Sequence, residues 1–327
     1  MKAVVCAAYG DPEDLALVTD AAAPNPGPGQ VAIDVKVAAL NFPDLLTIKG
    51  AYQVRPEPPF SPGFEASGLI AAVGDGVTEL SVGDRVAAAG VFGAFAERWI
   101  VDADHCVVVP DRVSFETAAA TIIAYATSYH ALVNRAPIAR NDTLLVLGAA
   151  GGVGSAAVEI GAMLGARVIA AASSDDKLAH CRERGAADTI NYATEDLRTR
   201  VKELTSGRGV DVVYDPVGGE YAEPAFRSLG WRGRHLVIGF TAGEIPRVPW
   251  NLALLKEASV VGVYWGGWSM HDPAGSRRFL EQVFALVEDG SLSPSVTASF
   301  PIDEFLKAYD LVRSRAARGK VVLRIGA

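Results

Sequence analysis

A glycine-rich turn at residues 149–154, AAGGVG, has the composition needed to hold a phosphate. An apolar run at 144–147 leads into it, and a helix-like stretch follows directly. Glycines let the backbone approach a pyrophosphate closely, and the amides at the start of the helix then bind the anion. Ala149 replaces the first glycine of the usual GxGxxG pattern, but the order strand, turn, helix, strand is the one that a dinucleotide site requires. The alternative is a turn that only packs a helix on a sheet.

The end of the second strand indicates which nicotinamide cofactor the turn would hold. A site for NAD usually has Asp or Glu there to bind the ribose 2'-hydroxyl. Here the strand RVIAAA runs into Ser173 and Ser174, and Asp175 and Asp176 begin the next helix, where acids also favour the helix dipole. Small hydroxyls and Lys177 accept a 2'-phosphate, so the sequence predicts NADPH, although Lys177 can also be read as a solvated helix residue. If Lys177 and one further cation each form a charge-assisted bond of ~1.5–3 kcal/mol, the preference over NADH is roughly 10²–10⁴.

Composition disfavours several other classes of protein. The chain has 327 residues, half of them hydrophobic, and 33 glycines, which suits two domains with large cores. A formal net charge of -8 argues against a nucleic-acid or acidic-membrane partner. No apolar run reaches the ~18–20 residues of a membrane span, and the first residues turn polar too soon for a signal peptide, so we expect a cytoplasmic protein. The three cysteines and five histidines are scattered, which disfavours a metal site or a disulfide framework.

Two kinds of pattern divide the chain. The first third carries short strand-like runs separated by Gly, Pro and Asp, as in an irregular β-barrel or sandwich. From Ser114, a candidate helix N-cap, strand and helix patterns alternate, which predicts a parallel, doubly wound sheet. The tail after Pro273 does not continue the alternation, and we expect it to return to the first domain. The predicted fold is therefore α/β, with a discontinuous β-rich domain of residues 1–122 and 268–327 and a Rossmann domain of residues 123–267.

This order of parts resembles the zinc-free medium-chain dehydrogenase/reductases, specifically the NADPH:quinone oxidoreductase (zeta-crystallin-like) family. The resemblance covers almost the whole chain. Its strongest carriers are NFPDLL (41–46), GAYQ (50–53), PFSPGFEASG (59–68), VGDRV (82–86), NDTLLVLGAAGGVG (141–154), DVVYDPVGG (211–219) and RGKVVL (318–323). It implies a GroES-like catalytic domain together with the Rossmann domain, and NADPH as the cofactor.

The resemblance also implies that no metal takes part. Zinc-dependent alcohol dehydrogenases use a Cys in the first of these segments and a His before the Glu of the third. The matching residues here are Asn41 and Phe64, the latter beside Glu65. Because tetrahedral zinc needs soft or imidazole ligands at fixed positions, hydrogen bonds must polarise the substrate oxygen instead.

The family's cofactor contacts can be carried over position by position. Together with the glycine turn and the two serines they give an expected NADPH site of Asn41, Thr127, Ala150, Gly151, Gly152, Val153, Gly154, Ser173, Ser174, Lys177, Tyr192, Phe240, Thr241 and Arg315. By resemblance, Lys177, Tyr192 and Arg315 lie near the 2'-phosphate, so Arg315 could be the further cation. Phe240 and Thr241 would line the nicotinamide. Tyr192 can equally be a packing residue, and Arg315 a surface arginine.

The expected reaction is hydride transfer from NADPH to an electrophilic carbon conjugated to a carbonyl, as in a quinone. Tyr52 and Asn41 are the expected catalytic residues, since both could hydrogen-bond the oxygen that gains charge, and Tyr52 or water could protonate it. Relatives often have a second tyrosine where this chain has Leu46, which leaves Tyr52 as the main candidate hydroxyl. Alternatively, Tyr52 contributes only an aromatic ring to the wall of the substrate cleft.

Other readings stay open. The runner-up is an NADPH-dependent reductase of alkenals, enones or enoyl-CoA double bonds, and a rival from another class is a non-catalytic NADPH-binding protein. Glu65, Asp44 and the strand-end Asp215 are expected to be structural. Residues 259–267 read as the last strand of the Rossmann sheet, whose unpaired edge favours a homodimer.

Overall fold

The computed structural model describes residues 1–326 and divides the chain into two compact units. The first contains Met1–Ile123 and the chain from Gly266 on, and the second contains Ala124–Trp265. These boundaries lie within two residues of those expected from the sequence.

The second unit contains a parallel sheet with the strand order β10-β9-β8-β11-β12-β13. All five pairings along this path are parallel. The strands are β8 (Thr143–Val146), β9 (Arg167–Ala172), β10 (Asp188–Asn191), β11 (Val210–Asp215), β12 (Leu229–Val237) and β13 (Ser259–Gly262). Chain order reverses between β8 and β11, as in a doubly wound Rossmann fold, where ligands bind at the carboxyl ends of the strands. The predicted fold class is confirmed.

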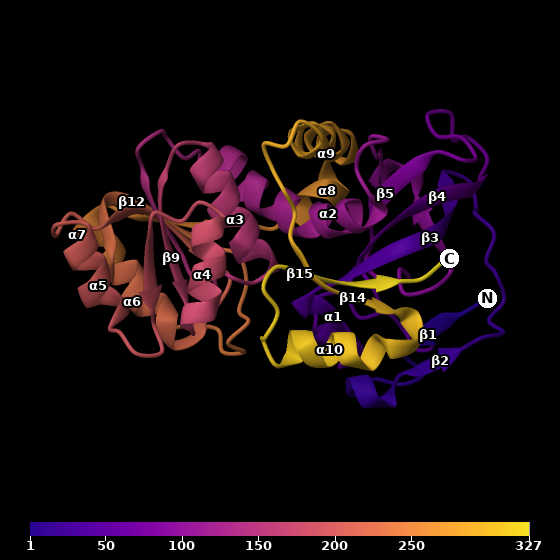
Figure 1. Cartoon of the computed structure of the whole chain (residues 1–327), viewed down its shortest axis with the longest axis horizontal. Helices are drawn as coiled ribbons and strands as arrows, with labels where there is room; N and C mark the ends of the chain where they lie inside the picture. The colour runs from indigo at the N-terminus through magenta and orange to yellow at the C-terminus, as the bar shows by residue number, and fades with distance from the viewer. Residues whose placement is uncertain (327) are drawn as a thin grey trace. The chain divides into compact units, whose positions relative to one another are not determined.

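Helices cover both faces of this sheet. Figure 1 shows α3 and α4 on one face and α5, α6 and α7 on the other. Their bounds are α3 (Gly152–Met163), α4 (Asp175–Glu183), α5 (Leu197–Leu204), α6 (Ala222–Arg227) and α7 (Asn251–Lys256). The central strands β8 and β9 are nearly continuous apolar runs, because helices bury both of their faces.

The first unit is built on a mixed sheet with the order β14-β15-β3-β4-β5-β7, and β6 also pairs with β3. These strands are β3 (Gln30–Leu40), β4 (Glu65–Val73), β5 (Arg85–Ala89), β6 (Arg98–Asp102), β7 (Cys106–Val108), β14 (Val296–Pro301) and β15 (Lys320–Arg324); β1 (Ala3–Val5) and β2 (Ala16–Val18) form a separate pair. The C-terminal strand β15 lies antiparallel to β3, with Val321 opposite Leu40. The tail therefore returns to the first domain, as predicted.

The helices of the first unit are α1 (Phe42–Ile48), α9 (Pro273–Glu288) and α10 (Phe305–Arg313), while α2 (Phe115–Tyr129) and α8 (Trp265–His271) contain the unit boundaries. Short helical turns lie at Pro12–Asp14, Ala103–His105, His130–Arg135, Gly219–Tyr221 and Ile302–Glu304. The predicted N-cap of α2 is present, because Thr117 N donates to Ser114 Oγ at 3.1 Å.

One predicted element is shorter than expected. The strand predicted for 259–267 ends at Gly262, and Trp265–His271 form helix α8. Val263 N still donates to Val237 O at 3.0 Å, after which the chain leaves the edge of the sheet. Gly266 and Gly267 have weak strand propensity, so the apolar composition of this segment overstated its length.

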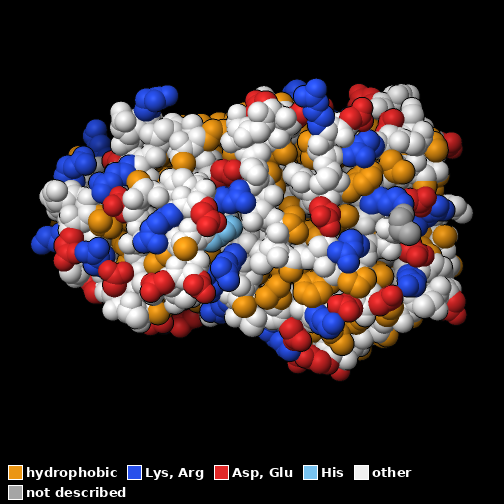
Figure 2. Space-filling model, in the orientation of Figure 1, with side chains coloured by type: hydrophobic (Ala, Val, Ile, Leu, Met, Phe, Trp, Pro, Cys, Tyr) orange, Lys and Arg blue, Asp and Glu red, His pale blue; other side chains and the backbone are white. Residues whose placement is uncertain are grey.

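Two further observations bear on partners. Within residues 1–326, none of the helices has the length and apolar character that a bilayer span requires. On the face drawn in Figure 2, cationic and anionic side chains are intermixed, so that face offers no patch of a single sign to a polyanion.

Candidate active site

The glycine turn joins β8 to α3 in the second unit, as the sequence predicts. Gly148 has a φ of +55°, and a Cβ on Gly154 would lie 2.2 Å from Gly148 O, so only glycine fits at 154. Gly151 is exposed immediately before α3. The amides of Gly152, Val153 and Gly154 belong to the first helical turn, where no intrahelical carbonyl can accept from them. These N–H groups, at the positive end of the helix dipole, can hold a phosphate.

Helix α2 is fastened to this turn through a side chain next to Thr127. Ser128 Oγ donates to Val153 O at 2.8 Å and lies 2.8 Å from Tyr214 Oη. Thr127 is half-buried on the same helix, and Ala150 is buried in the turn. The structure thus brings Thr127 and the glycine turn into one region.

A second group lies at the carboxyl ends of β9 and β10. Lys177 Nζ donates to Ser173 Oγ at 3.1 Å, and Ser174 is the residue before α4. Tyr192 follows β10, and its N–H donates to Ala172 O at 3.1 Å, at the end of β9. Two hydroxyls and an ammonium group therefore gather where the ribose of a bound dinucleotide would lie, whereas the centroid of the Tyr192 ring lies 4.6 Å from that of Tyr221.

The first acidic residue after this strand is engaged in another contact. Asp175 begins α4 and is exposed, and its Oδ1 accepts a hydrogen bond from Asn191 Nδ2 at 2.9 Å. The carboxylate that could imitate the acid of an NAD site is thus engaged with the end of β10.

Phe240 and Thr241 lie half-buried in the segment after β12. Thr241 N donates to Pro216 O at 3.1 Å, which joins this segment to the turn after β11. Asp215 ends β11, and its Oδ1 accepts from the amides of Val217 and Gly218, both at 2.8 Å. Asp215 is therefore a turn-forming residue, as expected.

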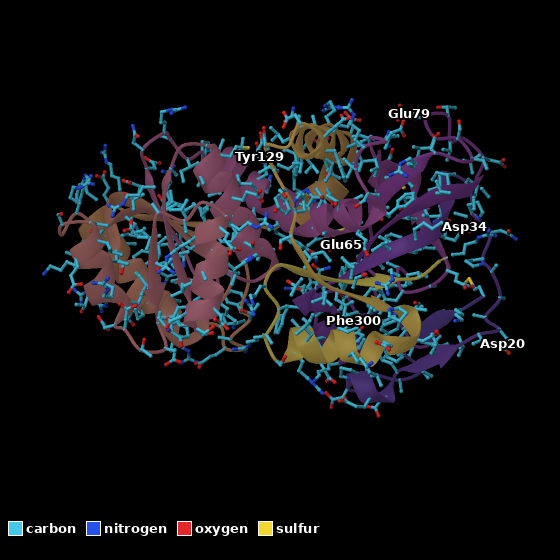
Figure 3. All side chains as sticks on the ribbon, viewed as in Figure 1. Asp20, Asp34, Glu65, Glu79, Tyr129 and Phe300 are labelled. Atoms are coloured by element: carbon cyan, nitrogen blue, oxygen red, sulfur yellow. The ribbon has the colours of Figure 1, made fainter. Side chains whose placement is uncertain are left out.

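In the first unit, Asn41 belongs to a buried polar network with Glu65, which is labelled in Figure 3. Asn41 Nδ2 donates to Glu65 Oε1 at 2.8 Å, and Asn41 Oδ1 accepts from Lys320 Nζ at 2.6 Å. Lys320 Nζ also donates to Glu65 Oε1 at 2.6 Å and to Leu40 O at 3.0 Å. Glu65 Oε2 accepts from Ile123 N at 2.7 Å. The side chains of Lys320 and Glu65 are 4% and 0% exposed, so this is a fully desolvated ion pair.

This network determines the orientation of the Asn41 amide. Its Nδ2 also approaches Ala39 O at 3.4 Å, so both amide hydrogens are directed at protein acceptors. A hydrogen bond from Asn41 to a substrate oxygen would replace one of them. Asn41 Oδ1 accepts a hydrogen bond from Lys320 Nζ, and its second lone pair can accept another.

Asp44 is buried next to this network and carries an unusual pKa. Its Oδ2 accepts from Asn41 N at 2.7 Å and so caps α1. Burial raises the pKa of Asp44 from 3.8 to about 7, helped by the negative charge of Glu65 and opposed by the bond from Asn41 N and the charge of Lys320. Both acids have the structural roles that the sequence suggested.

Tyr52 lies half-buried in the loop after α1, and its ring meets that of Phe64 edge to face at 5.4 Å and 86°. Phe64 directly precedes Glu65, so the first unit places Tyr52 near the buried network. Arg315 is exposed just after α10, with a φ of +56°. A hollow of about 580 Å³ beside it is lined by Phe300, Lys307, Asp310, Leu311, Arg313 and Ser314, none of them a predicted site residue.

Comparisons with known proteins give the family. Residues 27–111 match the model of the alcohol dehydrogenase GroES-like domain, and residues 152–282 match that of zinc-binding dehydrogenases. The chain is 38% identical over 325 residues to a quinone oxidoreductase-like protein 2 homolog of Nematostella vectensis, covering 98% of this chain and 88% of the relative. The chain belongs to the quinone oxidoreductase family of the medium-chain dehydrogenase/reductases. The resemblance identified from the sequence motifs is confirmed.

Solved quinone oxidoreductases share the whole architecture. The quinone oxidoreductase of Escherichia coli, solved in complex with NADPH, is 30% identical, with a TM-score of 0.93 and coverage of 99% of this chain and 100% of that one. A mycobacterial protein solved with NADPH is 31% identical, with the same TM-score and coverage.

The name of one family model implies zinc, and the residues of this chain do not fit it. The two positions expected to carry zinc ligands hold Asn41 and Phe64, and the ammonium group of Lys320 already compensates Glu65. Among the described residues, His, Cys, Asp and Glu form no group of three or more that could hold a metal ion. An amide, a phenyl ring and an ion-paired carboxylate do not provide the donors of a tetrahedral zinc site.

Sequence reasoning missed Lys320 as a member of this site. The feature that could have indicated it is a lysine at the start of an otherwise apolar strand, KVVL. This strand belongs to the motif RGKVVL, which resembles the family. Only the pairing of β15 with β3 brings it to Asn41, 279 residues away in the chain.

The raised pKa of Asp44 leads to a stability prediction. Because the folded protein binds this proton more tightly than the unfolded chain, the stabilisation by the proton is complete below pH 3.8 and is lost as the pH rises through 7. The loss is up to about 4 kcal/mol. Asp44→Asn keeps an acceptor for Asn41 N but does not titrate. The free energy of unfolding of each protein is measured in urea from pH 5 to 8. The value for Asp44→Asn minus the value for the wild type should therefore increase as the pH rises.

The matched control is Asp14→Asn, because Asp14 accepts the same kind of bond, from Asp11 N at 2.9 Å, at an exposed position. Equal pH slopes for the wild type and Asp44→Asn would show that burial does not raise the pKa of Asp44.

Proposed function

We propose that this protein is an NADPH-dependent quinone oxidoreductase that transfers a hydride to a quinone, or a similar conjugated carbonyl, without zinc. Membership of the quinone oxidoreductase family supports the reaction class. The observation that carries the choice of cofactor is the contact of Lys177 with Ser173 at the end of β9, with the Asp175 carboxylate bonded to Asn191. Hydroxyls and a cation suit a 2'-phosphate, which a carboxylate would repel.

The proposed cofactor site has three parts. The amides of Gly152, Val153 and Gly154 bind the pyrophosphate. Ser173, Ser174 and Lys177 bind the adenosine 2'-phosphate, with Tyr192 beside them. Thr127, Phe240 and Thr241 contact the nicotinamide end. The first two parts are supported by the short distances around the glycine turn and around Lys177.

In the proposed reaction, bound NADPH supplies the hydride. A quinone spreads the arriving electron pair onto its oxygen, so a weaker electrophile than zinc suffices. Tyr52 donates a hydrogen bond to that oxygen, and Tyr52 or water delivers the proton. Asn41 contacts the cofactor and substrate region in the orientation set by Lys320 and Glu65, because its amide is already held by both.

We also propose that the protein is a homodimer joined through β13. This strand is at the end of the strand order of its sheet, and Val260 on it is 42% exposed. The neighbouring segment exposes Trp250, Leu254 and Leu255 by 71%, 81% and 69%. An unpaired strand edge next to large exposed apolar side chains suits a self-complementary interface between two copies.

A substrate panel tests the function. NADPH oxidation should be fastest with 1,2-naphthoquinone and slow with crotonyl-CoA and an alkenal. Tyr52→Phe should lower kcat with the quinone by about 100-fold or less, because water can replace the lost acid. The measurement is the loss of NADPH absorbance for both proteins with all three substrates.

Each other result has a distinct meaning. Turnover confined to the alkenal or crotonyl-CoA would make the protein a double-bond reductase. Tight NADPH binding without turnover of any substrate would make it a cofactor-binding protein. An unchanged kcat in Tyr52→Phe would remove Tyr52 from the reaction.

The cofactor assignment predicts the effect of removing one charge. Lys177→Ala should lower the preference for NADPH over NADH by about 10- to 100-fold, since a charge-assisted bond contributes ~1.5–3 kcal/mol. Dissociation constants of both cofactors, measured by fluorescence titration, give this ratio. Lys202→Ala removes an exposed cation from α5 and serves as the control. An equal loss of affinity for both cofactors in Lys177→Ala would contradict the assignment.

The dimer predicts a change of mass in solution. The wild type should sediment as a dimer, and Val260→Lys and Leu254→Glu should each weaken association by at least about 10-fold, because each buries an unpaired charge in the interface. Val82→Lys changes a valine that is 64% exposed on the first unit and should remain dimeric. A monomeric wild type in analytical ultracentrifugation would refute the proposal.

A further inference from the structure

A buried His–Asp pair lies beneath the carboxyl ends of β11 and β12. His235 on β12 and Asp215 at the end of β11 are 4% and 3% exposed, and His235 Nε2 lies 3.1 Å from Asp215 Oδ2. Since a carboxylate oxygen can only accept, Nε2–H is the donor. The imidazole lies 5.7 Å from the ring of Phe226, and within residues 1–326 its Nδ1 has no hydrogen-bond partner. The imidazole therefore contributes one polar contact, the bond to Asp215.

Asp215 uses its other carboxylate oxygen to shape the turn that follows. Oδ1 accepts from Val217 N and Gly218 N, both at 2.8 Å, so one side chain satisfies two consecutive buried amides. Both following glycines are left-handed, with φ of +66° at Gly218 and +56° at Gly219. This conformation depends on the position of the carboxylate, and the bond from His235 limits its rotation.

The turn at 215–219 is hydrogen-bonded to the segment that follows β12. Pro216 O accepts from Thr241 N at 3.1 Å, and Val217 O accepts from Ala242 N at 2.9 Å. Packing is equally close, since a Cβ on Gly218 would lie 2.8 Å from Phe240 Cδ1. A shift of the turn must therefore move Phe240 and Thr241.

We propose that His235 is a positioning residue: by holding the Asp215 carboxylate it fixes the turn at 215–219, and through it the segment that presents Phe240 and Thr241 to the nicotinamide. The inference rests on the proposed function, because it takes these two residues as the nicotinamide contacts. Displacement of positioning groups by about 1 Å can lower a rate by as much as 100-fold, so a buried bond far from the reacting atoms can control turnover.

Two replacements of similar size separate the hydrogen bond from packing. His235→Met fills the space without a donor, whereas His235→Gln places an N–H near the position of Nε2. The probes are NADPH, which spans the whole site, and adenosine 2',5'-bisphosphate, which reaches only the part at β9 and the glycine turn. Their dissociation constants are measured together with kcat and KM for a quinone.

His235→Met should bind NADPH more weakly and lower kcat by about 10- to 100-fold, while the affinity for adenosine 2',5'-bisphosphate stays within about twofold of the wild type. His235→Gln should recover most of the loss. If His235→Met does not fold, Gly219→Ala tests the same link from a half-buried position, because its added Cβ would lie 2.7 Å from Ala242 Cβ. It should give the same selective loss.

Wild-type kinetics in a folded His235→Met, an equal loss of affinity for both ligands, or no recovery in His235→Gln would each overturn the inference. A wild type that binds neither NADPH nor the bisphosphate would instead refute the proposed function, so the two failures are distinguishable.

Discussion

The nucleotide half of this protein depends on a constraint of chain topology. A strand–helix–parallel-strand connection is right-handed, so reversal of the chain order between β8 and β11 puts α3 and α4 on one face and the later helices on the other. The carboxyl ends of all these strands then meet at one edge of the sheet. The glycine turn, Lys177 and Thr241 follow β8, β9 and β12, and they share this edge because these strands run parallel in one sheet.

In the other half, a buried ion pair holds the candidate site residue Asn41. Lys320 and Glu65 form an ion pair with almost no exposure to water. Removal of either partner would leave a buried charge without compensation, which is strongly destabilising. Asn41, Leu40 and Ile123 complete the hydrogen bonds of the pair. The ammonium group of the last strand supplies the positive charge beside Glu65.

Prediction from sequence succeeded where a local pattern implies a unique structure. The turn at 149–154 and the N-cap at Ser114 each follow from residues close together in the chain. It failed at residues 263–267, because an apolar run ending in glycines reads equally well as strand or as the approach to a helix. Most candidate residues were identified from the motifs that resemble the family. These motifs did not indicate that the Asn41 amide donates to Glu65 and accepts from Lys320.

The sequence by itself determined the fold class, the dinucleotide turn, and the absence of a carboxylate at the end of the second strand, since these features depend on residues close together in the chain. Only the tertiary structure decided the contacts of Lys320 with Asn41 and of His235 with Asp215. Both join residues on different strands, and a lysine or histidine in an apolar strand does not reveal its acceptor. The physical reason is that a buried polar group must find a partner wherever strand pairing places one, and pairing between distant segments is not encoded locally.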